Sequence, residues 1–279
     1  MGPFEIILCV LSGILLLVML IAVYMIYPGN CKRRREMEKY RRVKYAHRGL
    51  HDKEKPENSM SAFRAAKEHG FGIELDVRLS KDGELVVYHD DDLTRVAGRE
   101  GKVKDYTVSE LTEMPLLGTS DCIPTLREVL ELIDGSVPLL VELKCLTSES
   151  GVAEKFVEVI EGYKGDFVVE SFNPLELRKL KKLRPDILRG ILSAEYTKDE
   201  KNKGKILMVL AEKLMLNFLM RPDFISYDHC GYKVHNLQLI RRSFGTPLMA
   251  WTVKSLEEEK MAVSHGFDTV IFEGYIPEK

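Results

Sequence analysis

Cysteine is scarce in this sequence, and its spacing excludes several kinds of site. The chain has five cysteines in 279 residues. None belongs to a closely spaced pair of the kind that zinc–thiolate sites and disulfide-rich folds use; they are Cys9, Cys31, Cys122, Cys145 and Cys230. The cysteines therefore fit a reducing compartment and predict no metal–thiolate centre.

Charge is absent from one long segment near the N-terminus. Residues 6–27 contain no charged side chain. As a helix that rises about 1.5 Å per residue, this segment would span roughly 33 Å, which is about the thickness of bilayer hydrocarbon. It predicts a transmembrane helix. A cleaved signal peptide is the alternative, but the apolar run is too long, Glu5 is the only charged residue before it, and no small-x-small cleavage site follows.

Basic residues are absent before this helix and dense after it. No Lys or Arg precedes residue 6, whereas eight lie between residues 32 and 44. Because basic residues are retained on the cytoplasmic side, we expect a single-pass protein of the cell membrane whose larger part is cytoplasmic. The basic segment also suits attraction to anionic lipid headgroups. We divide the chain into residues 1–44, the helix with a basic linker, and a domain over residues 45–279.

Positive charge is not in excess in the predicted domain. Residues 45–279 contain 33 Lys and Arg against 40 Asp and Glu, a net charge of −7. A negative domain repels the phosphate backbone, so its charge argues against nucleic acid as a partner.

A glycine-rich dinucleotide-binding loop is also missing, although the domain alternates strands and helices. Short apolar stretches predict eight strands, at residues 43–47, 72–77, 138–144, 167–171, 187–192, 224–228, 247–253 and 267–272. Amphipathic stretches predict helices at residues 59–69, 126–133, 152–163, 175–183, 206–218, 237–243 and 255–265. This alternation predicts an α/β fold, a TIM (β/α)8 barrel. A doubly wound open sheet is the alternative, and the missing loop would have supported it.

A small β-hairpin is predicted after the second strand. The pair Asp82-Gly83 is a strong turn signal between that strand and a further apolar stretch at residues 84–89. A turn centred on this pair places Asp76 opposite His89. The hairpin would thus bring His89 back to the end of the second strand.

Carboxylates gather where predicted strands end. Glu74 and Asp76 are two residues apart on one strand, so their side chains point to the same face. His47 ends the first strand and would stand beside them at the C-terminal end of the barrel, where TIM barrels carry their active sites. In the stretch "VELK", Glu142 shares a face with Lys144.

Three carboxylates at one rim suggest a cation. Glu74, Asp76 and Glu142 offer only oxygen ligands, which suit one divalent cation, Mg²⁺ or Ca²⁺, better than zinc. Taken singly, each could be a surface charge paired with Arg48 or Lys144. Taken together they would repel one another unless a cation lay among them, so a metal site is the better interpretation of the three carboxylates.

Several motifs together resemble the glycerophosphodiester phosphodiesterase family. They are "AHRG", "PENS", "IELDVRLSKDGELVVYHDDDLTR", "IPTLREVL", "VELK", "ESF" and "WTV", in the order and spacing of that family. The resemblance runs from about residue 43 to the C-terminus and is most specific between residues 46 and 144. By position it implies an acid/base pair, two phosphate ligands, two aromatic pocket residues and three metal ligands; these are His47 and His89, Arg48 and Lys144, Trp251 and Phe172, and Glu74, Asp76 and Glu142. For Phe172, packing in the core is an equal alternative.

The resemblance implies metal-dependent hydrolysis of glycerophosphodiesters to sn-glycerol 3-phosphate and an alcohol. An enzyme of the lysophospholipase D or sphingomyelinase D kind, in some cases with intramolecular attack to a cyclic phosphate, is an alternative, because a membrane anchor suits a lysophospholipid or other lipid substrate. A catalytically silent, membrane-tethered binding domain is another, but it would not need both histidines and all three carboxylates.

The remaining polar residues receive simpler assignments. Asn58 either braces the loop beside His47 or caps the helix that follows it. The other histidines have no comparable carboxylate setting and are assigned to the surface or to packing; they are His51, His69, His229, His235 and His265.

Two segments depart from the family pattern. The family usually carries Thr-Asp after its last strand, whereas this chain has Phe272-Glu273, which moves the carboxylate outward by one methylene and leaves the role of Glu273 open. Residues 201–220 match nothing general in the family and are apolar enough to form a covering helix or a lipid-facing one.

Overall fold

A closed barrel of eight parallel strands forms the centre of the protein. The computed structural model describes residues 2–29, 33–145 and 151–278. The barrel strands are β1 (Tyr45–Ala46), β2 (Gly72–Leu79), β4 (Leu139–Leu143), β5 (Phe167–Ser171), β6 (Arg189–Ser193), β7 (Phe224–Asp228), β8 (Leu248–Val253) and β9 (Thr269–Phe272). They hydrogen-bond in the order β1-β9-β8-β7-β6-β5-β4-β2, and pairing of β1 with β2 closes the ring. Each predicted stretch overlaps one of these strands, so the TIM barrel is confirmed.

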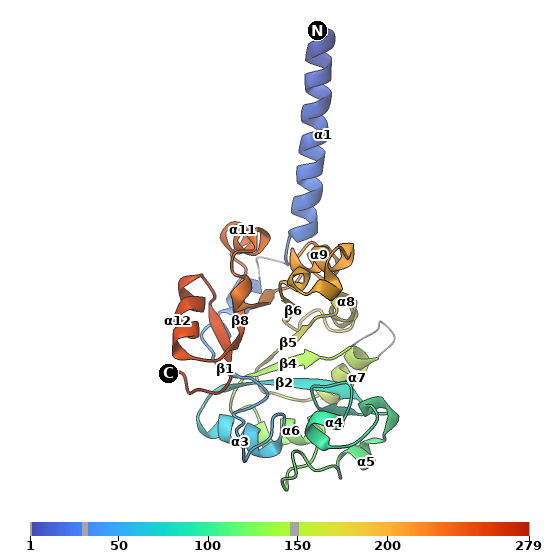
Figure 1. The fold of residues 1–279 in the computed structure, drawn as a ribbon, viewed down its shortest axis with the longest axis vertical. Helices are drawn as coiled ribbons and strands as arrows, with labels where there is room; N and C mark the ends of the chain where they lie inside the picture. The colour runs from blue at the N-terminus through green and yellow to red at the C-terminus, as the bar shows by residue number, and fades with distance from the viewer. Residues whose placement is uncertain (1, 30–32, 146–150, 279) are drawn as a thin grey trace.

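Helices surround the barrel (Figure 1). They are α3 (Met60–Glu68), α6 (Leu126–Ile133), α7 (Val152–Val159), α8 (Pro174–Leu183), α9 (Ile206–Glu212), α10 (Asn217–Met220), α11 (His235–Phe244) and α12 (Leu256–Ser264). Side-chain oxygens determine where several helices begin, because they accept hydrogen bonds from backbone N–H groups that have no partner within the first turn. Ser59 caps α3, Thr125 caps α6 and Asn173 caps α8.

The segment predicted as one helix over residues 206–218 forms two short helices instead. After α9 ends, Leu214 takes a φ of 58°, in the left-handed region that cannot continue a right-handed helix. The Leu214 side chain is buried, so the turn places it in the core. The connection between β6 and β7 also contains two 3₁₀ turns before α9, which are η3 (Tyr196–Lys198) and η4 (Glu200–Asn202). A further 3₁₀ turn, η5 (His229–Gly231), follows β7.

Inward-facing side chains change character along the strands. Leu140 and Val168 belong to an apolar cluster that also contains Met249. Glu142 and Glu170 lie two residues further along the same strands and therefore face the same way. The barrel interior is thus apolar towards the N-terminal ends of the strands and charged at their C-terminal ends.

A small layer with its own apolar core is inserted after β2. It contains β3 (Leu85–Val87), α4 (Thr94–Ala97), η2 (Val103–Asp105) and α5 (Val108–Leu111). Tyr88, Leu93 and Leu111 are buried in its cluster. β3 pairs antiparallel with β2.

The register of this pair differs by one residue from the predicted one. Tyr88 N–H donates to the Asp76 carbonyl at 2.9 Å, so Asp76 faces Tyr88 and not His89. The cause is the loop, which has three residues, 81–83, rather than two. Ser80 and Glu84 still pair across it, and Gly83 takes the left-handed φ of 80° that such loops need.

The N-terminal apolar segment forms a helix that projects away from the barrel, α1 (Pro3–Ile26) (Figure 1). It is long and apolar enough to cross a membrane, and the other described residues bury none of its most apolar stretch. A membrane span and a signal sequence both fit these properties.

The basic linker packs against the barrel. The side chains of Met37, which ends α2 (Arg34–Met37), and of Tyr40 are buried in the apolar cluster at the N-terminal ends of the strands. The Arg33 guanidinium donates to the Ile187 carbonyl at 3.2 Å and pairs with Asp223 at 3.3 Å. Residues 33–41 therefore close the end of the barrel opposite the charged layer. Cys31 and Lys32 lie outside the described residues.

Candidate active site

Three buried carboxylates meet at the C-terminal ends of two neighbouring strands. Glu74 and Asp76 come from β2 and Glu142 from β4, where Asp76 and Glu142 are register partners. One ligand oxygen from each lies within 4.8 Å of the others, and all three side chains are buried. The predicted cluster therefore exists as a geometric unit.

The electrostatics of this cluster favour a cation. Burial raises the pKa of Glu74 well above its usual value, and the charges of Asp76 and Glu142 raise it further. Burial also raises the pKa of Glu142 to about 7, although Lys144 opposes this shift. Asp76 Oδ1 is buried and accepts no hydrogen bond of acceptable geometry from the residues that the structure describes. A set of oxygen donors in which burial and mutual repulsion resist the ionisation of Glu74 and Glu142 fits a hard divalent ion.

Two basic side chains flank the carboxylates. Lys144 Nζ lies 2.7 Å from Glu142 Oε2 and 3.1 Å from Asp76 Oδ1. Arg48 Nε lies 3.4 Å from Asp76 Oδ2, and Arg48 Nη1 donates to Glu57 at 2.7 Å. Burial opposes the ionisation of Asp76, but Lys144 and then Arg48 outweigh it and lower the pKa of Asp76.

The loop after β1 holds its polar groups in strained conformations. Arg48 and Asn58 have φ values of 54° and 56°, which non-glycine residues rarely adopt. Arg48 N–H donates to Glu74 at 2.9 Å, and Asn58 Nδ2 donates to Asp76 at 2.8 Å. Asn58 thus braces the carboxylate of Asp76, while the neighbouring Ser59 caps the helix.

His47 is held by a carboxylate from the other end of the chain. Its Nδ1 lies 2.6 Å from Glu273 Oε2, and its backbone N–H donates to the Phe272 carbonyl at 2.9 Å. Burial lowers the pKa of His47 despite this hydrogen bond, and the same bond lowers the pKa of Glu273 to about 2. An ionised carboxylate only accepts, so Nδ1 carries the proton and Nε2 is the free base.

His89 has an equivalent partner. Its Nδ1 lies 2.6 Å from Asp90 Oδ1, and Asp90 is in turn bound by Arg95 Nε at 2.6 Å. Arg78 fixes the backbone here by donating to the His89 carbonyl at 2.6 Å. Burial lowers the pKa of His89, although the charge of Asp76 opposes the shift.

A small cavity of about 90 Å³ collects these groups. Eight of the nine predicted residues line it, and the ninth, Asp76, lies behind them in the carboxylate cluster; the eight are His47, Arg48, Glu74, His89, Glu142, Lys144, Phe172 and Trp251. Phe172 and Trp251 pack edge to face with ring centroids 5.5 Å apart. Phe172 is 40% exposed, so it belongs to the cavity wall and not to the core.

Sequence reasoning missed one buried acid in this cavity. Glu170, the last residue but one of β5, is in register with Glu142 and accepts a hydrogen bond from the Ser226 hydroxyl. Burial raises the pKa of Glu170 to about 8. The motif "ESF" drew attention to Phe172 only. Glu170 could have been found from the sequence, because it is the acid of this motif and stands near the end of a predicted strand, at the position equivalent to Glu142 of "VELK".

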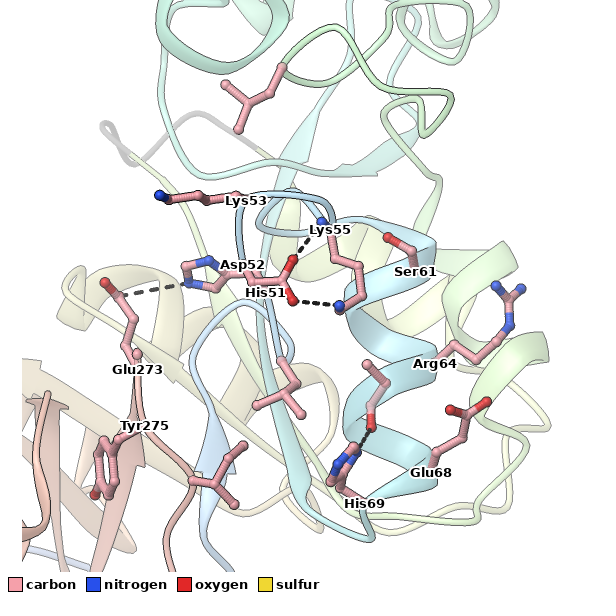
Figure 2. A pocket seen from close by; sticks show the side chains of 15 residues that line it. His51, Asp52, Lys53, Lys55, Ser61, Arg64, Glu68, His69, Glu273 and Tyr275 are labelled. Carbon is pink, nitrogen blue, oxygen red and sulfur yellow. Dashed lines mark hydrogen bonds and ion pairs between the residues drawn. The ribbon is translucent and has the colours of Figure 1, made fainter.

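A larger cavity of about 1040 Å³ lies on the far side of Glu273, between the loop after β1, α3 and the C-terminal segment. Figure 2 shows Glu273 and His51 at its wall, with His51 Nε2 3.9 Å from Glu273 Oε2. The assignment of His51 to a setting without a carboxylate was therefore wrong, because the fold brings the C-terminal segment beside it. His229 likewise lies 3.7 Å from Glu258.

The fold and this rim define a class of protein, an α/β barrel whose acidic centre, two histidines and two cationic side chains share one cavity. The model of the glycerophosphoryl diester phosphodiesterase family matches residues 47–274. The chain therefore belongs to this family of phosphoric diester hydrolases.

Individual relatives and solved structures agree with this assignment. A glycerophosphodiester phosphodiesterase of Caldanaerobacter subterraneus is 40% identical over 53% of this chain; the match spans 65% of that protein, just under two thirds of its length. The structure of the Thermotoga maritima glycerophosphodiester phosphodiesterase is 31% identical, with a TM-score of 0.64, over 82% of this chain and 94% of that one. A phosphodiesterase of Oleispira antarctica, solved in complex with the product sn-glycerol 3-phosphate, is 26% identical with a TM-score of 0.66, over 82% of this chain and 92% of that one.

Proposed function

We propose that this protein is a membrane-anchored, divalent-metal-dependent enzyme that hydrolyses glycerophosphodiesters to sn-glycerol 3-phosphate and an alcohol. The observation that carries the proposal is the cavity shared by two carboxylate-bound histidines and a buried three-carboxylate cluster. The sn-glycerol 3-phosphate held by the Oleispira antarctica protein supports the choice of substrate.

Glu74, Asp76 and Glu142 would hold the cation, Mg²⁺ or Ca²⁺. When bound, it would neutralise negative charge on the phosphate oxygens. Lys144 and Arg48 supply fixed positive charge at the same place, so that they hold the phosphodiester and stabilise the additional charge of the transition state.

The two histidines divide the proton transfers. Each has its Nδ1 bound to a carboxylate, Glu273 for His47 and Asp90 for His89, which leaves Nε2 to face the substrate. One Nε2 takes the proton of the attacking water, and the other donates a proton to the alkoxide that leaves. Glu273 and Asp90 are positioning residues in this scheme.

The aromatic wall favours one alternative substrate class. Phe172 and Trp251 give the polar cavity an apolar side, which suits the acyl-bearing part of a lysophospholipid. Lysophospholipase D activity is therefore a second candidate function. The phosphate product, open-chain or cyclic, would distinguish hydrolysis from cyclisation.

Product analysis of the purified full chain tests both functions. We expect sn-glycerol 3-phosphate from a panel of glycerophosphodiesters, loss of turnover in excess chelator, and recovery with Mg²⁺ or Ca²⁺. Lysophosphatidate or a cyclic phosphate from lysophospholipids would favour the second candidate. A protein that binds these molecules without turning them over, with metal present, would establish the silent binding domain.

Substitution of the histidines tests the catalytic assignment. His47→Ala and His89→Ala should each lose roughly 10²- to 10⁴-fold in turnover while their circular dichroism stays native. A substrate with a very good leaving group should rescue only the variant that lacks the acid. Near-normal turnover of either variant would remove that histidine from the mechanism.

A further inference from the structure

The connection between β6 and β7 exposes apolar side chains beside the anchor helix. Ile206 and Leu207 of α9 are 76% and 59% exposed. Outside α1, Ile206 is the most exposed large apolar side chain of the described residues. Two adjacent aliphatic side chains that are exposed at the start of a helix indicate a surface that binds a partner.

This connection is attached to the end of α1. Asn217 Nδ2 donates to the Ile26 carbonyl at 3.0 Å, and Arg221 Nη1 donates to the carbonyls of Tyr24 and Tyr27 at 2.9 and 2.7 Å. The last carbonyls of a helix have no partner within the helix, so these donors satisfy α1 where it ends. Direct bonds therefore fix the position of α10 relative to α1, and only four residues separate the end of α9 from the start of α10.

Aromatic contacts show at what depth the connection would lie. The Tyr24 ring packs against Phe218, with centroids 5.9 Å apart, and Tyr27 packs against Phe244 at the end of α11 at 5.1 Å. Tyrosines at the end of a transmembrane helix occupy the headgroup region of a bilayer. Figure 1 shows α9 and α11 beside the lower end of α1, on the side of the barrel from which α1 rises.

The charges around α9 match an anionic surface. Lys201, Lys203 and Lys205 precede Ile206 and are exposed. Lys203 pairs with Glu200, whereas Lys201 and Lys205 make no ion pair within the described parts of the chain. Apolar side chains bordered by lysines, at headgroup depth, are typical of helices that lie in a membrane interface.

We propose that α9 lies on the membrane surface that α1 crosses, with Ile206 and Leu207 inserted at the boundary of headgroups and acyl chains, and Lys201 and Lys205 beside anionic headgroups. The inference rests on the proposal that α1 spans the bilayer. Docking through α9 would hold the barrel in one orientation to the bilayer, together with the bonds from Asn217 and Arg221.

A fluorophore on Leu207→Cys in the full chain, with the native cysteines replaced by serine, tests the contact. The protein is placed in vesicles of phosphatidylcholine and phosphatidylglycerol that contain nitroxide-labelled lipid. We expect quenching at position 207 several times that at Val263→Cys, a matched control on α12 that is 55% exposed and lies farther from α1 in Figure 1. Changing Lys201 and Lys205 to glutamine should weaken docking roughly fivefold for each lysine removed.

A second label separates failure of the contact from failure of the anchor. In a chain that keeps only Cys9, within α1, the fluorophore should be strongly quenched. Quenching at Cys9 with equal, weak quenching at 207 and 263 overturns the docking of α9 and leaves the anchor standing. Absence of quenching at Cys9 overturns both. Protection of position 207 that grows with protein concentration, without quenching by lipid, would show that a second copy of the chain covers α9 instead.

Discussion

His47 owes its orientation to a carboxylate that sequence comparison left without a role. Glu273 follows the last strand where the family usually has aspartate, and its longer side chain reaches His47 Nδ1 at 2.6 Å. Only closure of the barrel brings residues 47 and 273 together, through the pairing of β1 with β9. At the scale of single residues, the proposed mechanism therefore depends on a bond between the two ends of the barrel sequence.

Glu273→Gln should shift the pH dependence of the reaction. The Glu273 carboxylate raises the pKa of His47, so a neutral amide should lower that pKa further and move the limb of the pH–rate profile that belongs to His47 to lower pH. Turnover should fall by at least roughly tenfold, because the imidazole loses the acceptor that fixes its tautomer. The conservative Glu273→Asp should retain the position of the limb. An unchanged profile for Glu273→Gln would exclude the positioning role.

The buried acids should make the metal-free protein sensitive to rising pH. Folding raises the pKa of Glu142 to about 7 and of Glu170 to about 8, from an ordinary value of 4.5. The stability that the protonated forms contribute is complete below the ordinary value and is lost as the pH rises from there through the raised values, at up to about 1.4 kcal/mol per pH unit for each group.

Thermal unfolding in chelator measures this effect. The midpoint should fall between about pH 5 and about pH 8, and Mg²⁺ or Ca²⁺ should restore it, because a bound cation stabilises the ionised carboxylates. Glu142→Gln should show a smaller fall over the same range, which separates this acid from the titration of His47 and His89. A midpoint that rises with pH in the wild-type chain, to the same extent as in the variant, would contradict the assignment.

At the scale of elements, the linker between α1 and β1 is part of the barrel. Arg33 donates to backbone carbonyls just before β6 and to the Asp223 carboxylate just before β7. Met37 and Tyr40 are buried in the apolar cluster at the N-terminal ends of the strands. A linker of basic residues predicts topology, but nothing in its charge indicates which residues it will bury. Among the basic residues whose side chains the structure describes, Arg33 and Arg41 are bound by the barrel domain, Arg41 through Asp268, whereas Arg35 and Arg42 are exposed to solvent.

Arg33→Ala should destabilise the barrel by about 1.5–3 kcal/mol, the usual range for lost hydrogen bonds of a charged group. The loss also leaves Asp223, which is buried, with one cation fewer. Chemical denaturation of the full chain in detergent micelles measures the difference. Arg35→Ala is the control, since Arg35 belongs to the same basic segment but is exposed. Equal effects of the two substitutions would show that charge, and not the contacts of Arg33, stabilises this end.

At the scale of the whole molecule, α1 and the barrel are joined without a long tether. Gly29 N–H donates to the Pro222 carbonyl at 2.8 Å, so the chain meets the barrel within three residues of the end of α1. The barrel would then stay close to the leaflet on its own side, where phospholipids and their deacylated products occur.

The cytoplasmic orientation of the barrel is tested with a reporter fused after Lys279. We expect activity only from a reporter that works in the cytoplasm, because the basic residues between positions 32 and 44 should keep that end of the helix on the cytoplasmic side of the membrane. Replacing the exposed Arg35, Lys39 and Arg42 by glutamine should give a mixed orientation, while Arg33 continues to support the fold. Digestion of the barrel by protease outside intact cells would refute the orientation.

Some predictions failed for local reasons. The hairpin turn signal at Asp82-Gly83 correctly indicated a reversal, but a three-residue loop needs the same glycine as a two-residue loop, so the register was wrong by one. The helix over residues 206–218 has unbroken helical composition, and its break at Leu214 depends on burial of that side chain against the rest of the barrel. Short-range patterns fix the kind of element more securely than its ends.

The sequence by itself determined the strands, their inward faces and the candidate site residues at their ends, because strand alternation and the position of active sites in a barrel follow from period and order along the chain. Tertiary structure alone decided that Glu273 binds His47, that Glu170 joins the charged layer, and that residues 33–41 close the opposite end. These contacts join residues far apart in the chain, and burial raises the pKa of Glu170. Neither the distance nor the burial can be read from the neighbours of a residue in sequence.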